Sequence, residues 1–222
     1  MLAGKQIVVT GANGALGGAV VTQALGKGAK LVAVDREFTV KNPDVEQIVV
    51  DLTDSEATRA AFEELGTVDA LCNIAGGFSM GPDTYALDND EWEHLFAMNV
   101  TTMRNVNAAI VPKMLANGEG RIVNVGALSA REGQAQMSAY CASKSTVMRL
   151  TESLSKELRH EGINVNAVLP SIIDTPTNRN DMPDADFGQW VAPADLAEVM
   201  LFLCSDAAKP IHGALVPVPG LS

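Results

Sequence analysis

Short apolar runs alternate with longer amphipathic stretches along almost the whole chain. The runs predicted to be strands are Gln6–Thr10, Lys30–Val34, Gln47–Val50, Val68–Ile74, Arg121–Val125, Ile163–Val168 and Ala214–Val218. Because these runs are apolar at nearly every position, they are typical of strands buried on both faces of a parallel sheet. Strands that alternate with helices predict the α/β class, and right-handed crossovers make a single doubly wound parallel sheet of about seven strands the expected fold.

Capping signals mark where several helices begin. Thr53 followed by Glu56, and Asp88 followed by Glu91, both match a capping box, in which a side-chain oxygen and a carboxylate satisfy free backbone N–H groups. The helix after Asp88 is long, and we expect Pro112 to bend or end it because proline lacks a backbone N–H group.

Two later segments complete the predicted architecture. A helix from about Ser138 to His160 carries an apolar stripe at helical spacing, which indicates a side covered by the core or by another subunit. The last strand contains Pro217 and Pro219, two positions apart, so their missing N–H groups face the same side. Such a strand must lie at the edge of the sheet.

The composition fits one folded domain without a nucleic-acid or membrane partner. The 222 residues are 47% hydrophobic and 19% charged, so one domain over residues 1–222 is the simplest organisation. The formal net charge of −11 repels phosphate backbones and anionic membrane surfaces. No apolar run approaches the roughly 20 residues of a membrane-spanning helix, and the first residues lack a signal-peptide pattern. We therefore expect a soluble, cytoplasmic protein.

Cysteine and histidine usage predicts neither a disulfide framework nor a metal site. Cys72, Cys141 and Cys204 are odd in number, far apart and set among apolar neighbours, which indicates buried reduced thiols. The three histidines are also scattered, so solvated side chains are a better interpretation than metal ligands.

A glycine-rich turn is the first candidate for ligand chemistry. It reads Thr10-Gly11-Ala12-Asn13-Gly14-Ala15-Leu16-Gly17, directly after the first strand, and it opens a helix. The free N–H groups at a helix N-terminus bind a pyrophosphate, and small residues let the phosphates approach the chain. A plain tight turn is the alternative for such a motif alone, but its place between the first strand and the first helix predicts a Rossmann-type NAD(P)-binding domain.

The end of the second strand indicates which dinucleotide is bound. Asp35 lies 18 residues after Gly17, where a carboxylate accepts hydrogen bonds from the adenosine ribose hydroxyls and repels a 2′-phosphate. The adjacent Arg36 argues weakly the other way, because an arginine there neutralises such a phosphate. We therefore expect NADH as the cofactor, with NADPH the less favoured alternative.

Tyr140 and Lys144 are the candidate catalytic pair. They are four residues apart in a helical segment and so lie on one face of the helix. A nearby ammonium group favours the anionic form of a tyrosine and lowers its pKa, so that the phenol exchanges a proton with substrate near neutral pH. Taken alone, such a pair is more often a surface or core contact.

Together, six ordered motifs resemble the short-chain dehydrogenase/reductase family over nearly the whole chain. They are the turn from Thr10 to Gly17, Asp51-Leu52 after the third strand, Asn73-Ile74-Ala75-Gly76 after the fourth, Asn99 in the long helix, the Tyr140 and Lys144 pair, and Pro170 leading to Thr175. The resemblance implies that Tyr140, Lys144 and Asn99 are catalytic, with Tyr140 donating the proton and Asn99 holding a water in the proton relay.

The resemblance also implies a set of cofactor contacts. Asp51 and Leu52 would border the adenine, Lys144 the nicotinamide ribose, and Ile173 and Thr175 the carboxamide. The full set is Gly11, Asn13, Ala15, Leu16, Gly17, Asp35, Arg36, Asp51, Leu52, Asn73, Ala75, Gly76, Tyr140, Lys144, Pro170, Ile173 and Thr175.

A homodimer or homotetramer is the assembly that the resemblance implies. In the family, the helices that correspond to the Asp88 and Ser138 helices pair across a two-fold axis. The apolar stripes of these two helices also exceed what one sheet face is expected to cover. The twin prolines predict that the last strand does not extend the sheet into a neighbour.

Two positions depart from the family pattern. Ala15 stands where the family has a glycine, and we expect it to crowd the turn slightly. Ala127 stands where the family has its catalytic serine, 13 residues before Tyr140, and neither Ser129 nor Ser138 is at that place. A carbonyl reductase without this hydroxyl loses a hydrogen bond to the developing oxyanion, unless Ser129 or a water replaces it.

The segment from Asp174 to Trp190 resembles the corresponding stretch of dihydropteridine reductases, which also have alanine in place of the serine and use NADH. It lies in a short substrate loop near residues 171–192, at the carboxyl ends of the strands, where ligands bind in such sheets. Trp190, Phe187, Met182, Phe78 and Met137 are candidates for an apolar wall, with core packing an equal alternative for the first two.

These features predict an NADH-dependent oxidoreductase that reduces quinonoid dihydropterin, with Tyr140 as proton donor. A general carbonyl or alcohol oxidoreductase is the first alternative. Because Ala127 replaces the serine, a non-catalytic NAD(H)-binding sensor or scaffold is an alternative of another class. The substrate would be a small pterin or carbonyl compound.

Overall fold

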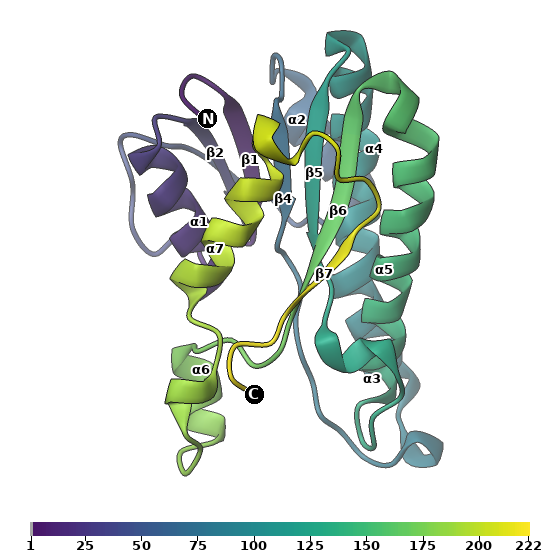
Figure 1. Cartoon of the computed structure of the whole chain (residues 1–222). Coiled ribbons are helices and arrows are strands. Elements are labelled where there is room, and N and C mark those ends of the chain that lie inside the picture. The colour runs from purple at the N-terminus through teal and green to yellow at the C-terminus, as the bar shows by residue number, and fades with distance from the viewer. Residues whose placement is uncertain (1) are drawn as a thin grey trace.

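A single parallel sheet forms the centre of the computed structural model, which describes residues 2–222 (Figure 1). Its strands are β1 (Gln6–Thr10), β2 (Lys30–Asp35), β3 (Glu46–Val49), β4 (Ala70–Asn73), β5 (Gly120–Val125), β6 (Ile163–Pro170) and β7 (Leu215–Val218). The seven strands follow the order β3-β2-β1-β4-β5-β6-β7, and every neighbouring pair is parallel. The predicted doubly wound Rossmann-type sheet is therefore confirmed. As predicted, the last strand lies at an edge, but β7 contains only Pro217, because Pro219 follows its last residue.

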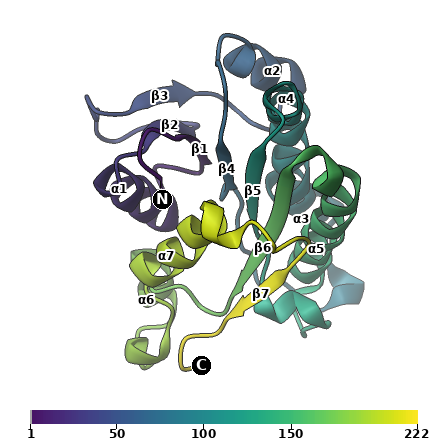
Figure 2. The ribbon, with the colours of Figure 1, turned by 45° about the horizontal axis from the view of Figure 1, so that its top comes forward.

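Helices cover both faces of the sheet (Figure 2). On one face, α1 (Ala15–Gly26) and α7 (Pro193–Leu203) pack against the sheet in one core cluster. On the other face, α2 (Ser55–Glu63), α4 (Thr102–Asn117) and α5 (Ser138–Leu158) pack in a second cluster. Between residues 2 and 222, no helix combines the length and the apolar character that crossing a membrane requires.

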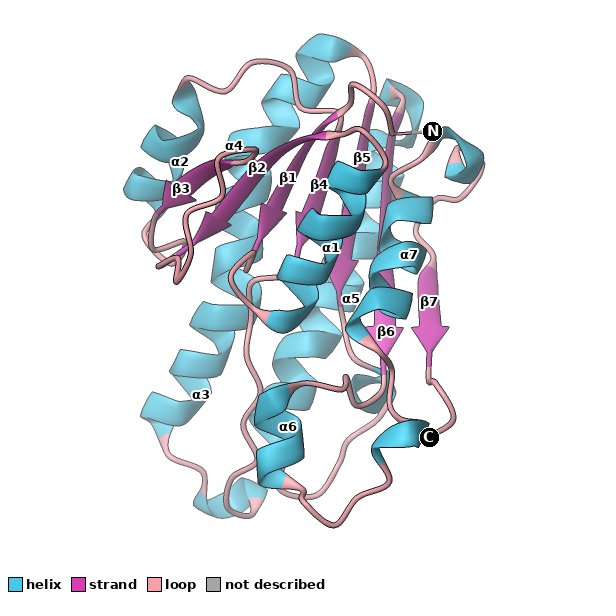
Figure 3. Cartoon of the chain, turned by 90° about the vertical axis from the view of Figure 1, so that its left-hand side faces the viewer, coloured by secondary structure: helices cyan, strands magenta, loops and turns pink. Residues whose placement is uncertain are grey.

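The carboxyl ends of the strands and the loops that follow them build the site. All strands point the same way, toward α3 (Asn89–Phe96) and α6 (Pro176–Asp181) in Figure 3. Loop 171–192 contains α6 and the 3-10 turn Phe187–Gln189, and it returns to the sheet where Ile173 pairs with Val191. Parallel sheets bind ligands at this edge because the connecting loops converge there.

Two predicted caps differ from the structure in detail. The N-cap of α2 is Asp54, not Thr53, because the Asp54 carboxylate accepts the N–H groups of the first turn and the Thr53 hydroxyl donates to Asp51 instead. Asp88 does cap α3, but the Glu91 carboxylate accepts a hydrogen bond from Ser79 rather than turning back to the cap. The second capping box is therefore only half formed.

Of the two effects predicted for Pro112, a bend or the end of the helix, the second is wrong. The helix α4 continues to Asn117, and Pro112 lies inside it. The sheet-facing residues Ile110 and Met114 are fully buried on either side of Pro112, so tertiary packing outweighs the one backbone hydrogen bond that proline removes. The long helix is interrupted earlier, by a π-helical turn over Ala97–Thr101.

Most of the apolar stripes of the long helices are covered within the chain. Val106 of α4 is fully buried, and Val147 of α5 packs in one cluster with Val100 of the π-helical turn and Met103 of α4. The stripes thus arise in part from packing of helix on sheet and helix on helix, whereas Phe96 and Leu150 are only partly buried and Trp92 on α3 is exposed. The three cysteines are buried and free, as predicted.

Candidate active site

The glycine-rich turn between β1 and α1 works because two of its residues cannot carry a side chain. Gly11 has a φ of +67°, and a Cβ there would lie 2.8 Å from the backbone nitrogen of Ala75. A Cβ on Gly17 would lie 2.1 Å from the carbonyl oxygen of Gly11. The exposed Ala15 begins α1, so the expectation that it crowds the turn is wrong.

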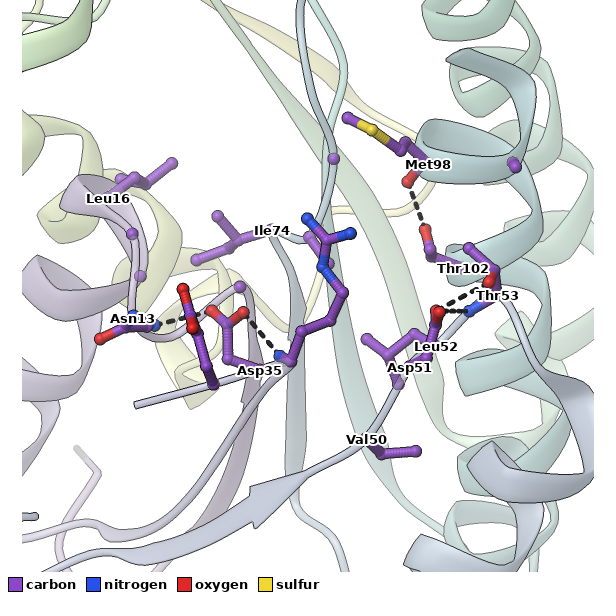
Figure 4. A pocket seen from close by; sticks show the side chains of 18 of the residues that line it. Asn13, Leu16, Asp35, Val50, Asp51, Leu52, Thr53, Ile74, Met98 and Thr102 are labelled. Carbon is purple, nitrogen blue, oxygen red and sulfur yellow. Dashed lines mark hydrogen bonds between the residues drawn. The ribbon is translucent and has the colours of Figure 1, made fainter. Parts of the chain in front are cut away.

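A cavity of about 900 Å³ opens beside this turn (Figure 4). Figure 4 shows Asn13 and Asp35 on one side and Asp51, Leu52 and Thr53 on the other. Of the predicted cofactor contacts, those that line this cavity are Gly11, Asn13, Ala15, Leu16, Gly17, Asp35, Arg36, Asp51, Leu52, Ala75, Gly76 and Thr175. The structure thus brings together residues from five separate parts of the chain that the sequence motifs had identified one at a time.

Nine further lining residues were not predicted. They are Gly14, Glu37, Val50, Thr53, Ile74, His94, Ala97, Met98 and Thr102. Most of them adjoin a motif in sequence, and adjacency could have found them. The other signal is the π-helical turn, because His94, Ala97, Met98 and Thr102 come from the helical segment that contains it. No local pattern in the sequence predicts how that segment is placed.

Two aspartates flank the cavity in defined positions. The Asp35 carboxylate accepts the backbone N–H groups of Asn13 at 2.9 Å and Arg36 at 2.8 Å. These bonds hold it at the end of β2, beside the turn. Across the cavity, hydrogen bonds from the Thr53 hydroxyl and backbone N–H hold the pKa of Asp51 below its usual range, with a smaller contribution from the charge of Arg36.

The catalytic candidates lie next to this cavity rather than in its lining. Tyr140 and Lys144 are one turn apart on α5, and the buried Lys144 Nζ donates to the Val125 carbonyl at 2.9 Å. A Cβ added to Gly76 would lie 3.3 Å from Lys144 Nζ and 2.6 Å from Asn99 Oδ1. Only a glycine lets the loop after β4 reach these two side chains.

Asn99 joins three elements of the site. It lies in the π-helical turn and is buried. Its Oδ1 accepts the Gly77 N–H at 3.0 Å, while its Nδ2 donates to the Gly77 carbonyl and to Ser143 Oγ, each at 3.1 Å. The Ser143 hydroxyl in turn donates to the Tyr140 carbonyl at 2.8 Å. The loop after β4, the π-helical turn and α5 are therefore fixed relative to one another.

The protonation states differ from the expectation. Burial raises the pKa of Tyr140 to about 12, with a smaller contribution from Cys141. Burial also lowers the pKa of Lys144 to about 8. The expectation that the Lys144 ammonium lowers the pKa of Tyr140 is wrong for this structure. Lys144 donates its hydrogen bond to the Val125 carbonyl, and the loss of solvent around the phenol has the largest effect on the tyrosine pKa.

The surroundings of Tyr140 are apolar. Ala127 is 3% exposed and packs in a cluster with Cys141, Met148 and Leu169, against which Tyr140 also lies. The Phe78 ring meets the Tyr140 ring edge to face, with 4.9 Å between centroids. Ala127 thus contributes a methyl group to an apolar environment beside Tyr140.

Besides Tyr140 and Lys144, three predicted contacts do not line the cavity. The Asn73 amide is buried and donates to Asn107 and Asn124, so it links β4 to α4 and β5 inside the core. Pro170 is buried at the end of β6, and Ile173 pairs with Val191 at the base of loop 171–192. Successive side chains of a strand point to opposite faces of the sheet, and a sequence motif does not show which of them face the cavity.

The site fits a dinucleotide. The turn keeps its two obligate glycines where phosphates would approach the N-terminus of α1, and the fixed Asp35 carboxylate lies where a ribose would follow. At the other end, Gly76 leads to the buried pair of Lys144 and Asn99. A doubly wound sheet with this turn and this tyrosine–lysine helix defines an NAD(P)-dependent oxidoreductase.

The chain belongs to the short chain dehydrogenase family, whose pattern matches residues 5–186. L-xylulose reductase of Bos taurus is 30% identical to it over 236 residues, covering 99% of this chain and 96% of that protein. A Beutenbergia cavernae protein described as an NAD(P) dependent gluconate 5-dehydrogenase, with bound NADP at low occupancy, superposes with a TM-score of 0.92, 31% identity and coverage of 99% and 96%.

A second solved relative holds the other dinucleotide. Carveol dehydrogenase of Mycobacterium avium, in complex with NAD, superposes with a TM-score of 0.88 and 25% identity, and the match covers 98% of this chain and 97% of that one. Relatives of this chain therefore bind either NAD or NADP.

Proposed function

We propose that this oxidoreductase uses NADH to reduce a quinonoid dihydropterin. One observation carries the substrate class: the buried methyl group of Ala127 lies in the apolar cluster beside Tyr140, where the family serine would place a hydroxyl. A ketone develops a localised oxyanion during reduction, and losing one donor to it costs about 3 kcal/mol. A conjugated imine system spreads its charge and has less need of that donor.

Tyr140 is the proposed proton donor. Because burial raises its pKa to about 12, the phenol is fully protonated at neutral pH and has a proton to give. When bound, the nicotinamide supplies the hydride. Lys144 would hold the nicotinamide ribose, and the Asn99 and Ser143 hydrogen bonds keep the tyrosine helix in register with the loop after β4.

Preference for NADH over NADPH is the second part of the proposal. The Asp35 carboxylate is fixed at the end of β2, and Glu37 lines the same cavity. Two carboxylates near the adenosine ribose repel a 2′-phosphate, while Arg36 offsets only one of them. NADH should therefore bind at least about tenfold more tightly, which corresponds to about 1.4 kcal/mol.

The purified wild-type chain tests both parts. Steady-state rates of NADH oxidation should be much higher with quinonoid dihydropterin than with simple ketones or aldehydes. Calorimetric titration with NADH and NADPH measures the cofactor preference independently. Reduction of ketones but not of the pterin would contradict the substrate class, and equal affinities would assign Arg36 to a 2′-phosphate.

A general carbonyl or alcohol oxidoreductase is the second candidate, favoured by the names of the relatives, which include L-xylulose reductase and a gluconate 5-dehydrogenase. A non-catalytic NAD(H) sensor or scaffold is the third. Tight NADH binding without turnover of either substrate class would support the third candidate.

We also propose a cytoplasmic homodimer or homotetramer. Trp92 is 41% exposed on the outer side of α3, stacked on Phe96, and offers apolar surface for a partner copy. Three free buried thiols suit a reducing compartment. Light scattering that gives the monomer mass of about 23.3 kDa at micromolar concentration would contradict the assembly, and cell fractionation tests the compartment.

A further inference from the structure

Loop 171–192 closes on itself through backbone hydrogen bonds at its base. The Asp174 N–H donates to the Val191 carbonyl at 2.8 Å, and the Val191 N–H donates to the Ile172 carbonyl at 2.9 Å. The residues between these two anchor points carry α6 and the aromatic side chains Phe187 and Trp190. Beyond the base, the Leu221 N–H of the C-terminal segment donates to the Gln189 carbonyl at 2.9 Å, and side chains make further contacts within the loop.

Three consecutive residues at the start of the loop are each held by α6. The Asn178 Nδ2 donates to the Ile173 carbonyl at 2.8 Å, and the Thr175 hydroxyl accepts the Asn178 N–H at 3.1 Å. Between them, Arg179 donates through Nε and one terminal nitrogen to the two oxygens of Asp174, at 2.5 and 2.7 Å. Thr175 lines the cofactor cavity, so this cluster fixes part of its wall.

The same guanidinium group also contacts the far end of the loop. It lies 4.7 Å from the centroid of the Phe187 ring, and that ring packs at 4.8 Å against Trp190, which is buried. A planar guanidinium both forms a two-pronged bond to a carboxylate and stacks on an aromatic face, which a lysine ammonium does not reproduce. Arg179 therefore joins the first half of the loop to the second.

We propose that Arg179 is a positioning and specificity-determining residue, which holds loop 171–192 closed beside the nicotinamide end of the site. Through Asp174 it fixes the backbone of Ile173 and Thr175. Through Phe187, which packs on Trp190, it holds the second half of the loop against the first, and a loop held closed in this way limits the size of the substrate. This inference rests on the proposed function for the identity of the substrate, but the geometry of the loop is independent of it.

The ion pair between Arg179 and Asp174 stays charged between about pH 5 and 9. The Arg179 guanidinium holds the pKa of Asp174 below its usual range. A depressed carboxylate pKa keeps the ion pair intact above the ordinary value of about 4 and weakens it only as the pH falls further. Any pH dependence of the reaction between about pH 5 and 9 should therefore come from groups other than this pair.

The test compares Arg179→Met, Arg179→Lys and Phe187→Leu with the wild type. Arg149→Met is the matched control, because it removes an exposed arginine from an ion pair with Glu152 on α5, at 3.0 Å. Limited proteolysis without ligands reports loop opening, and calorimetry reports the NADH affinity. We expect Arg179→Met to be cleaved within residues 176–189 several-fold faster and to bind NADH about fivefold more weakly.

Kinetics then separate positioning from general damage. For Arg179→Met we expect KM for NADH and for the pterin to rise with kcat changed less than twofold, and the relative rate on bulkier carbonyl compounds to rise. Arg179→Lys and Phe187→Leu should each show a part of these effects, because the first keeps the charge without the planar fork and the second keeps the bond to Asp174 without the aromatic face. Arg149→Met should match the wild type throughout.

Several results would overturn the proposal. Equal proteolysis and equal NADH affinity in Arg179→Met and Arg149→Met would show that the loop does not depend on Arg179. Wild-type behaviour of Arg179→Lys would show that a point charge suffices and that the planar fork has no role. If the wild-type protein does not reduce the pterin, only the proposed function is contradicted. The role of Arg179 is still tested, because limited proteolysis and NADH binding need no substrate.

Discussion

The dinucleotide half of this molecule and its catalytic half are specified in different ways. Around β1, β2 and α1, backbone geometry makes the site: Gly11 and Gly17 leave no room for a Cβ, and backbone N–H groups hold Asp35. Around β5, β6 and α5, side chains make it, and the properties of Tyr140 and Lys144 depend on what buries them. We therefore expect the dinucleotide half to tolerate few substitutions. In the catalytic half, substitutions of the surrounding side chains should change the pKa values of the catalytic groups.

The largest effect should come from the backbone half. Gly17→Ala places a Cβ 2.1 Å from the Gly11 carbonyl oxygen, so the turn must open, and we expect NADH affinity to fall by about a hundredfold or more. Gly18→Ala is the matched control, since its Cβ would meet only the Ala12 carbonyl, at 3.8 Å. Calorimetry measures both, with circular dichroism to verify folding, and equal affinities would show that the turn is not the phosphate site.

The next largest effect should come from the catalytic half. Tyr140→Phe keeps the ring that packs on Phe78 but removes the phenol, so kcat should fall by about a hundredfold with little change in NADH affinity. In the NADH-free protein, the phenolate absorbance that this substitution removes should emerge only toward pH 12. A loss of NADH binding equal to the loss of kcat would show a structural role instead.

Lys144 should make the free energy of unfolding depend on pH. Its pKa is lowered to about 8, so between that pH and its ordinary value of 10.5 the unfolded chain holds a proton that the folded chain lacks. Its contribution therefore rises as the pH rises through this window, by an amount on the order of 3 kcal/mol. Chemical denaturation of wild type and Lys144→Met across this range measures it, and a difference that does not change with pH would contradict the lowered pKa of the buried Lys144 amine.

The contrast between the halves also explains what sequence reasoning could predict. The sheet, the glycine turn and Asp35 follow from short local patterns, because each backbone requirement is met by one residue type at one place. The direction of the Asn73 side chain, the bond from Lys144 to Val125 and the π-helical turn around Asn99 depend on neighbours from distant segments. Spacing alone places Lys144 and Tyr140 on one face of a helix, but only packing determines their pKa values.

A smaller effect should separate the two dinucleotides. Asp35→Ser removes the fixed carboxylate and keeps a small hydrogen-bonding group, so the preference for NADH over NADPH should shrink by about tenfold, mostly through tighter NADPH binding. Glu37→Gln should reduce the preference further when combined with it, since both carboxylates border the cavity. If the ratio of NADH to NADPH affinity did not change in Asp35→Ser, the Asp35 carboxylate would not determine the cofactor preference.

The smallest effect should come from placing a serine at position 127. Ala127→Ser introduces a hydroxyl into the apolar cluster of Cys141, Met148 and Leu169, so we expect a loss of about 1 kcal/mol in stability unless the hydroxyl finds a partner. Turnover of the pterin should change by less than about twofold, whereas kcat/KM for simple ketones should rise proportionally more, because only they develop a localised oxyanion. Steady-state kinetics on both substrate classes decides it. If both rates rose equally, the hydroxyl would act on a step common to the two reactions, and the absence of the serine would no longer distinguish pterin from carbonyl reduction.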